Sequence, residues 1–282
     1  MSGESVAFTK MHGCGNDFIM IDGRAGLPGN GLVEPSRLTA ALCDRRRGIG
    51  ADGLILLLPP RADADFAMLY INATGAPGEM CGNGARCVAR FAYDIGAAPA
   101  EMSFETEAGP VHAQILPDHV TIDMPPPRDI RLGMRLDIAG IEREVHFAQV
   151  GVPHAVILVD DLPAFPVDEL GPLVRHHSAF PRGANANFVS TANGLAMRTF
   201  ERGVEAETLA CGTGAVATAT ICHLLGISGP DATIRTGGGD QLSVHLERDG
   251  DRFVRATLTG PTETVGGGVI SPEFLRSRGL LA

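Results

Sequence analysis

Two short stretches of the sequence each combine a cysteine with a glycine turn. Residues 81–85 read Cys-Gly-Asn-Gly-Ala and residues 211–215 read Cys-Gly-Thr-Gly-Ala, one copy in each half of the chain. An apolar helical pattern follows each copy, so each cysteine stands where a helix begins. The first N–H groups of a helix have no partner inside it and form the positive end of the helix dipole, which favours a thiolate. We therefore predict that Cys81 and Cys211 act as a base, an acid or a nucleophile.

The glycines of the two turns have a second consequence. Without side chains they let a ligand approach the backbone closely, and N–H groups at a helix start bind a carboxylate or a phosphate. Two such turns predict a single site with a thiol on each side.

The other four cysteines lack such a turn. Cys14, Cys43, Cys87 and Cys222 are interpreted as small buried thiols, the commoner fate of a cysteine. No C-x-x-C pair is present, and six cysteines in 282 residues do not predict a disulfide framework, so we expect reduced thiols. No His/Cys/Asp cluster has zinc spacing, and no metal is predicted.

Composition narrows the classes of protein. Apolar residues make up 44% and charged residues 20%, which is ordinary for a soluble protein, and 282 residues suffice for two domains. The net charge of −10 argues against a partner such as nucleic acid or an anionic membrane. No apolar run approaches the roughly 20 residues that span a bilayer, and no signal pattern opens the chain, so we expect a cytoplasmic protein.

Lysine usage bears on the cofactor. Lys10 is the only lysine, and any pyridoxal-phosphate mechanism through a Schiff base would have to use it. It lies in a predicted strand near the N-terminus. No cofactor is therefore predicted.

The pattern of the first half predicts strands, a helix, more strands and then the helix that follows Cys81. That second helix carries Arg86, Arg90 and Asp94 at i, i+4 and i+8, leaving most of its circumference apolar. The predicted ranges are strands at 6–11, 18–22, 54–58 and 65–72, helices at 35–46 and from the Cys81 turn to 95, and three strands between 102 and 124.

Three prolines at 125–127 end whatever element precedes them, and beyond them the order of elements recurs. The helix that follows Cys211 is apolar or small on every side, which predicts burial all round. The predicted ranges are a strand-loop-strand at 147–160, a helix at 167–177, strands at 186–190 and 195–201, a helix from the Cys211 turn to 225, and strands to 259.

These patterns predict an α/β (α+β) fold of two pseudo-symmetric domains. Each would be a curved, mainly antiparallel sheet or barrel around a central helix. The predicted N-terminal domain is 1–126, completed by the C-terminal segment 267–282, and the predicted C-terminal domain is 127–266.

The sequence resembles the diaminopimelate epimerase family of pyridoxal-phosphate-independent epimerases. The resemblance implies the sheet-around-helix fold in both halves and a homodimer. It also implies inversion of one α-carbon of LL-diaminopimelate to the meso form, a step in lysine and peptidoglycan-precursor biosynthesis. The matching stretches follow the family's order over most of the chain: residues 10–18, 48–53, 79–87, 153–154, 185–188, 201–203 and 208–215.

In the reaction that the resemblance implies, one cysteine takes the α-proton and the other delivers a proton to the opposite face. Removing the proton places charge on the α-carboxylate, and preorganised N–H donors stabilise that charge. The candidate donors are the backbone N–H groups of Gly82, Asn83, Gly212 and Thr213.

The resemblance also implies roles for polar side chains. Asn16, Asn72 and Asn185 would hydrogen-bond the amino and carboxylate groups of the substrate. Arg202 would bind the distal carboxylate, for which a bidentate guanidinium is suited. Where the family often has asparagine before a Pro-His pair, this chain has Val152, so one amide contact to the substrate is absent.

Two further residues would set the protonation states of the thiols. The resemblance places Glu201 near Cys211, where it also accepts the distal ammonium, and His154 near Cys81. Taken without the resemblance, Glu201 beside Arg202 is equally an ion pair at the surface, and His154 a satisfied core histidine.

Two other functions stay open at this point. Another two-cysteine racemase, acting on proline or hydroxyproline, would not need a group that binds a distal carboxylate. A thiol redox sensor or binding protein without turnover would be expected to show an exposed cysteine with a resolving partner close by.

Overall fold

The computed structural model describes residues 5–26, 34–78 and 81–281. Residues 79 and 80 of the 79–87 motif lie outside these ranges, as do residues 1–4, 27–33 and 282 of the predicted N-terminal domain. The chain divides into two compact units: unit 1 is residues 1–120 with 262–282, and unit 2 is residues 121–261. The boundary between the two units after residue 120 falls before the three prolines at 125–127. It lies within strand β7 (His119–Met124).

The described residues of unit 1 form a mixed sheet and three helices. Its elements are β1 (Val6–Gly13), β2 (Asn16–Asp22), α1 (Pro35–Cys43), β3 (Gly53–Leu58), β4 (Phe66–Asn72), α2 (Gly82–Asp94), β5 (Glu101–Thr106), β6 (Gly109–Ile115), β17 (Glu263–Ile270) and α5 (Pro272–Ser277).

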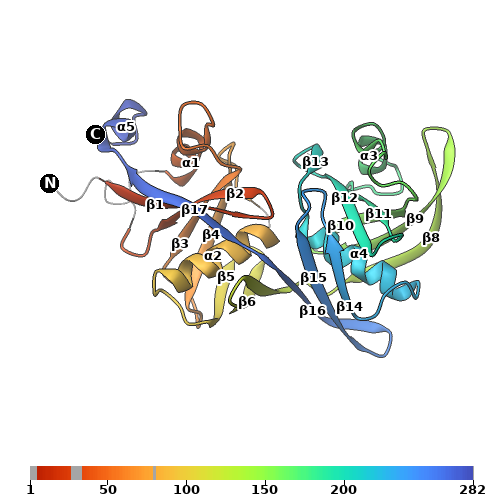
Figure 1. The fold of residues 1–282 in the computed structure, drawn as a ribbon. Helices are drawn as coiled ribbons and strands as arrows, with labels where there is room; N and C mark the ends of the chain where they lie inside the picture. The colour runs from red at the N-terminus through yellow and green to blue at the C-terminus, as the bar shows by residue number, and fades with distance from the viewer. Residues whose placement is uncertain (1–4, 27–33, 79–80, 282) are drawn as a thin grey trace. The chain divides into compact units, whose positions relative to one another are not determined.

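Strand β17 pairs with β1, so the end of the chain belongs to the first sheet. Strands β1 and β2 form an antiparallel hairpin, β2 and β3 are parallel, β3 and β4 antiparallel, β4 and β5 parallel, and β5 and β6 antiparallel. Helix α2 packs against β1, β2, β3 and β6, and Figure 1 shows it among these strands.

Unit 2 repeats this order of pairing. Strands β9 and β10 are antiparallel, β10 and β11 parallel, β11 and β12 antiparallel, β12 and β14 parallel, and β14 and β15 antiparallel. The elements are β8 (Arg128–Ile138), β9 (Ile141–Val150), β10 (Val152–Leu158), α3 (Val167–Arg175), β11 (Asn185–Ser190), β12 (Leu195–Glu201), β13 (Ala206–Thr208), α4 (Gly212–Leu224), β14 (Asp231–Arg235), β15 (Gln241–Asp249) and β16 (Arg252–Pro261).

Helix α4 is the centre of unit 2. It contacts β9, β10, β11, β14, β15 and β16, and Figure 1 shows it among the strands of this unit. Every residue from Gly214 to Cys222 is buried, which confirms the predicted burial for this part of the helix, whereas Leu225 at its C-cap is 36% exposed. The mixed α/β fold class is confirmed.

Three sequence-based expectations differ from the structure. Helix α1 ends at Cys43 and not at residue 46, because the Asp44 carboxylate accepts the N–H groups of Arg46 and Arg47 and turns the chain. The strand β8 was not predicted, although its apolar residues alternate from Ile130 to Ile138; most of its residues are exposed. Arg86 does not form part of a polar stripe: it is completely buried inside unit 1.

None of the helices within the described ranges is both long enough and apolar enough to cross a bilayer.

Candidate active site

Cys81 occupies the N-cap of α2. Its backbone is extended, with φ −116° and ψ 111°, and its sulfur accepts the N–H of Gly84 at 3.4 Å. Glycine at position 84 leaves room for strand β3, because a Cβ there would approach Ile55 Cδ1 to 2.9 Å and displace the end of that side chain. The glycine turn thus lets the helix start lie against strand β3 and leaves the thiol half-buried at its end.

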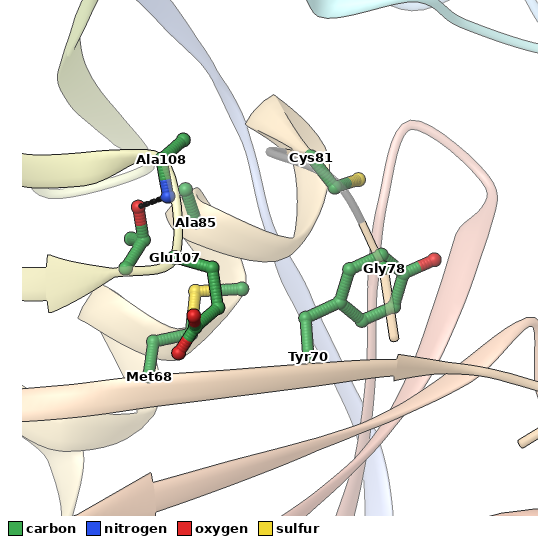
Figure 2. A pocket seen from close by; sticks show the side chains of 8 residues that line it. Met68, Tyr70, Gly78, Cys81, Ala85, Glu107 and Ala108 are labelled. Atoms are coloured by element: carbon green, nitrogen blue, oxygen red, sulfur yellow. Dashed lines mark hydrogen bonds between the residues drawn. The ribbon is translucent and has the colours of Figure 1, made fainter. Parts of the chain in front are cut away.

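A pocket in unit 1 opens beside this thiol. Met68, Tyr70 and Ala85 contribute to its wall together with Cys81, and Figure 2 shows the sulfur and the Tyr70 ring bordering it. The Tyr70 hydroxyl donates to Asn72 Oδ1 at 2.8 Å, and Asn72 Nδ2 lies 3.4 Å from the carbonyl of Pro77. Asn72 therefore stands at the edge of the pocket, with its amide oxygen occupied.

The orientation of Asn16 is fixed by its neighbours. Asn16 Nδ2 donates to Asp52 Oδ2 at 2.7 Å, and a carboxylate can only accept. The amide oxygen must then point the other way, where it lies 3.5 Å from Cys81 Sγ and 3.4 Å from Asn83 Nδ2. Asn16 presents an acceptor to the thiol.

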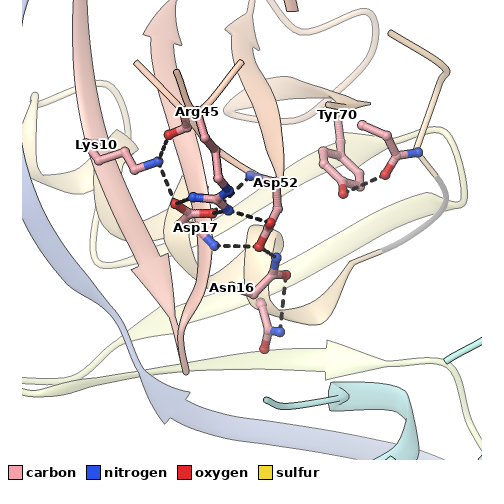
Figure 3. A network of polar contacts seen from close by, with 9 residues as sticks. Lys10, Asn16, Asp17, Arg45, Asp52 and Tyr70 are labelled. Atoms are coloured by element: carbon pink, nitrogen blue, oxygen red, sulfur yellow. Dashed lines mark hydrogen bonds and ion pairs between the residues drawn. The ribbon is translucent and has the colours of Figure 1, made fainter. Parts of the chain in front are cut away.

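Asp52 belongs to a network of ion pairs, shown in Figure 3. Arg45 bridges Asp52 at 2.7 Å and Asp17 at 2.8 Å, while Lys10 pairs with Asp17 at 2.7 Å and donates to the carbonyl of Gly50. Burial alone would raise the pKa of Asp17, but hydrogen bonds from Arg45 and Lys10 hold it well below its ordinary value. The only lysine of the chain is thus part of a structural network that supports Asn16.

The buried guanidinium of Arg86 hydrogen-bonds the first residues of α2. It donates to Asn83 Oδ1 at 2.9 Å, to the carbonyl of Gly82 at 3.2 Å and to Cys14 Sγ at 3.4 Å. Because Arg86 has only donors, Asn83 turns its amide nitrogen toward Asn16. Arg86 and Asp52 therefore fix the two amides beside Cys81 from opposite ends.

Cys211 holds the equivalent N-cap of α4, with φ −121° and ψ 110°. Its sulfur lies 3.5 Å from the Thr213 hydroxyl, and the residue is 4% exposed. Burial raises the pKa of the Cys211 thiol well above its ordinary value, and the nearby Glu201 raises it further. The prediction that the helix start favours a thiolate is wrong for Cys211, because the cost of burying a charge exceeds the stabilisation from the helix end.

The Glu201 carboxyl group is hydrogen-bonded to this thiol. It also accepts a hydrogen bond from the Thr208 hydroxyl at 2.5 Å. Burial raises the pKa of Glu201, and the two hydrogen bonds offset only part of that shift. Thr208 reaches Glu201 because β12 and β13 form an antiparallel pair. The result is a buried carboxyl–thiol pair in which both groups resist ionisation.

Three further predicted residues lie together in unit 2. Asn185 Oδ1 accepts the backbone N–H of Arg202 at 2.7 Å, which fixes the orientation of its amide. His154 pairs with Asn185 in the register of β10 and β11 and is completely buried. Burial, and then the positive charge of Arg202, lower the pKa of His154 to about 3.

The predicted site residues thus form one group in each unit. Unit 1 holds Asn16, Asn72, Cys81, Gly82 and Asn83. Unit 2 holds His154, Asn185, Glu201, Arg202, Cys211, Gly212 and Thr213. That His154 lies near Cys81 remains a prediction.

Sequence reasoning missed four residues that hold these groups in place: Asp52, Arg86, Asn187 and Thr208. A signal existed for Asn187, since it lies two positions after Asn185 and therefore on the same face of strand β11. Within the part of the chain that the structure describes, no group of three His, Cys, Asp or Glu side chains could hold a metal ion.

Comparison with known proteins agrees with this geometry. The profile of the diaminopimelate epimerase family matches residues 8–130 and 146–265. A diaminopimelate epimerase of Methanothrix thermoacetophila is 41% identical, with 96% of this chain and 98% of the relative covered. One of Chlorobaculum tepidum is 43% identical, with 93% and 100% covered.

Two solved structures show the same fold. A PhzF-family phenazine biosynthesis protein of Bacillus anthracis superposes with a TM-score of 0.73 at 14% identity, covering 95% of this chain and 99% of that one. A hydroxyproline epimerase of Agrobacterium vitis gives 0.71 at 22% identity, covering 95% and 93%. The family profile and the near full-length relatives show that this chain belongs to the diaminopimelate epimerase family.

Proposed function

We propose that this chain interconverts LL- and meso-diaminopimelate by two-base proton transfer at one α-carbon, without a cofactor. The observation that carries the proposal is the pair of cysteines at matching N-caps, Cys81 on α2 and Cys211 on α4. Each lies beside a fixed hydrogen-bonding side chain, Asn16 for one and Glu201 for the other.

The proton balance of the reaction is simple. One sulfur, as thiolate, takes the α-proton and becomes a thiol. The other, as thiol, gives its proton to the opposite face of the same carbon and becomes the thiolate. One C–H bond breaks and one forms, so the substrate is neither oxidised nor reduced. The reverse reaction exchanges the two roles.

Glu201 generates the thiolate at Cys211 by accepting the proton of that thiol. Since the pKa values of both Glu201 and Cys211 are raised, the ionised Glu201 carboxylate can take the thiol proton, and the one negative charge of the pair then moves to the sulfur. A base whose pKa is close to that of its donor transfers a proton with little cost. On the other side, Asn16 Oδ1 accepts from the Cys81 thiol, which keeps that sulfur protonated and ready to deliver.

The remaining residues bind the substrate. N–H groups at the starts of α2 and α4, from Gly82, Asn83, Gly212 and Thr213, stabilise the charge that develops on the α-carboxylate. Asn185 presents its amide nitrogen to a carboxylate oxygen, and Asn72 contributes its amide from the pocket edge. Arg202 binds the distal carboxylate, which selects a diacid.

Solvent exchange tests the proposal and its substrate together. The protein is incubated in heavy water with LL-diaminopimelate, meso-diaminopimelate, proline or hydroxyproline, and deuterium at the α-carbon is measured. We expect incorporation with diaminopimelate alone. Exchange into proline or hydroxyproline but not diaminopimelate would assign the chain to another two-cysteine racemase, and no exchange with any of the four would refute turnover.

We also propose that the protein is a cytoplasmic homodimer whose partner molecules are its small substrate and a second copy. The surface that supports a dimer is strand β17, where Val265 and Val269 are each 64% exposed. Exposed apolar side chains gathered on one strand mark interaction surfaces. Sedimentation should give a dimer for the wild type and a monomer for Val265→Glu; a monomeric wild type would contradict the dimer.

A further inference from the structure

Asn187 is a fully buried amide whose orientation is set by its neighbours in unit 2. Its Nδ2 lies 2.9 Å from the carbonyl oxygen of Ala155 and 3.4 Å from that of Asn185. Carbonyl oxygens only accept, so this end of the amide must be the nitrogen. The amide oxygen accepts from the Thr199 hydroxyl at 3.1 Å.

This orientation determines which nitrogen of His154 carries its proton. Asn187 Nδ2 lies 3.3 Å from His154 Nδ1. An amide nitrogen can only donate, so Nδ1 must be the unprotonated, accepting nitrogen. A neutral imidazole then carries its proton on Nε2, and a second proton would place two donors against each other at Nδ1.

The other nitrogen of His154 is a donor that the protein leaves unused. Nε2 is buried and has no hydrogen-bond partner among the residues that the structure describes. Leaving a buried donor unpaired is destabilising, so an unused donor of this kind is available to a ligand that completes the bond. Arg202, which the substrate's distal carboxylate would contact, is close enough to act on the His154 ring electrostatically.

Asn187 also touches the start of α4. A Cβ on residue 214 would lie 2.4 Å from Asn187 Oδ1 and 3.2 Å from Cys211 Sγ. Glycine at position 214 therefore lets the Asn187 amide and the Cys211 thiol pack against the same turn.

We propose that Asn187 is a positioning residue that locks His154 as a neutral imidazole with its proton on Nε2. His154 then serves the site as a hydrogen-bond donor and not as an acceptor of the thiol proton. The catalytic part of this inference rests on the proposed function, but the tautomer does not.

Nitrogen NMR of the unliganded, ¹⁵N-histidine-labelled protein tests the tautomer. His154 signals are assigned by their loss in His154→Gln. His146 is an internal reference, because its Nδ1 accepts the backbone N–H of Gly133 at 3.1 Å and must likewise be unprotonated. We expect His154 near neutral pH to show an unprotonated Nδ1 and a protonated Nε2, as His146 does. A proton on Nδ1, or a charged ring, would overturn the proposal.

Two variants test the part played by Asn187. Asn187→Leu removes the donor to Nδ1, so the His154 signals should shift toward a mixture of tautomers. The kcat should fall about tenfold, because only part of the population then presents the Nε2 donor. Thr199→Val is the matched control: Ala155 still orients the amide, and we expect the wild-type tautomer with kcat within about twofold.

A wild-type tautomer pattern in Asn187→Leu would show that another group orients the ring. If Asn187→Leu does not fold, the wild-type spectrum alone decides the tautomer. Since the spectrum needs no turnover, an inactive epimerase would leave that result standing, and a proton on Nδ1 in an active enzyme would overturn only this inference.

Discussion

The amide oxygen of Asn16 lies 3.5 Å from the sulfur of Cys81, and Asp52 holds the opposite end of the same amide at 2.7 Å. Since a carboxylate accepts and cannot donate, the acceptor that Cys81 meets is set by a residue that does not itself contact the thiol. Asp52 thereby determines that Cys81 meets an amide oxygen, which can accept the thiol proton in a hydrogen bond.

Replacing the Asp52 carboxylate should change the hydrogen bonding of the Cys81 thiol through the Asn16 amide. Asp52→Asn can donate as well as accept, so the Asn16 amide is free to rotate and turn its nitrogen toward Cys81. We expect kcat to fall about tenfold with KM changed less, because ground-state binding is largely kept. The matched control is Asp22→Asn, which breaks an Asp–Arg pair at the end of the same strand, β2. Equal effects from the two variants would contradict the positioning role.

The two thiols should be separately indispensable. Cys81→Ala and Cys211→Ala each remove the acid or base for one face of the carbon, and neither thiol can replace the other. Each variant should lose at least about 10³-fold in kcat and keep its fold by circular dichroism. Cys222→Ala, a buried thiol later in α4, is the control and should stay active. Near wild-type turnover in either site variant would refute the two-base assignment.

We expect Arg202 to determine the enzyme's selectivity for a substrate that carries a distal carboxylate. Arg202→Lys keeps the positive charge but loses the bidentate geometry, so kcat/KM for diaminopimelate should fall about 10²-fold. Arg235→Lys, at an exposed position on β14, provides the comparison and should behave as wild type. An Arg202→Lys enzyme that is as efficient as wild type would remove the distal carboxylate from this residue.

The stability of the protein should depend on His154 in mild acid. The folded chain lowers the pKa of His154 from 6.5 to about 3, so the unfolded chain binds a proton that the native state excludes. The stabilisation is complete above pH 6.5 and is lost as the pH falls toward 3. At pH 5 the cost is about 2 kcal/mol relative to neutral pH.

Urea unfolding at pH 7 and pH 5 measures this cost. His154→Gln should lose about 2 kcal/mol less than wild type between the two pH values. His176→Gln, at an exposed histidine, should follow wild type. An identical pH dependence in wild type and His154→Gln would show that the buried ring is not the titrating group.

The local sequence pattern was sufficient to predict the helix starts that carry Cys81 and Cys211. A cysteine before a glycine turn and an apolar helix predicted the N-caps at Cys81 and Cys211, because capping depends on neighbours in the sequence. The recurrence of elements after the three prolines predicted two similar halves, and the same order of strand pairing is found in both units.

What the sequence could not show depends on burial and on distant neighbours. Arg86 reads as a surface charge on a helix, yet it is buried because Asn83, Gly82 and Cys14 supply its partners. The raised pKa of Cys211 follows from packing around the start of α4, which a local helix-dipole argument does not include. Thr208 reaches Glu201 only through the pairing of β12 with β13.

The position of solvent deuterium in the first product molecules is the most direct test of the two-thiol reaction. Wild-type enzyme is given LL-diaminopimelate in heavy water, and the α-hydrogen is analysed in both product and remaining substrate before one-tenth is converted. If one thiol removes the proton and the other delivers a solvent-derived one, the meso product carries deuterium at the inverted carbon from the first turnovers. The remaining substrate then stays largely unlabelled. Product that retains the substrate's own hydrogen would show that a single base serves both faces, and would contradict the assignment of Cys81 and Cys211.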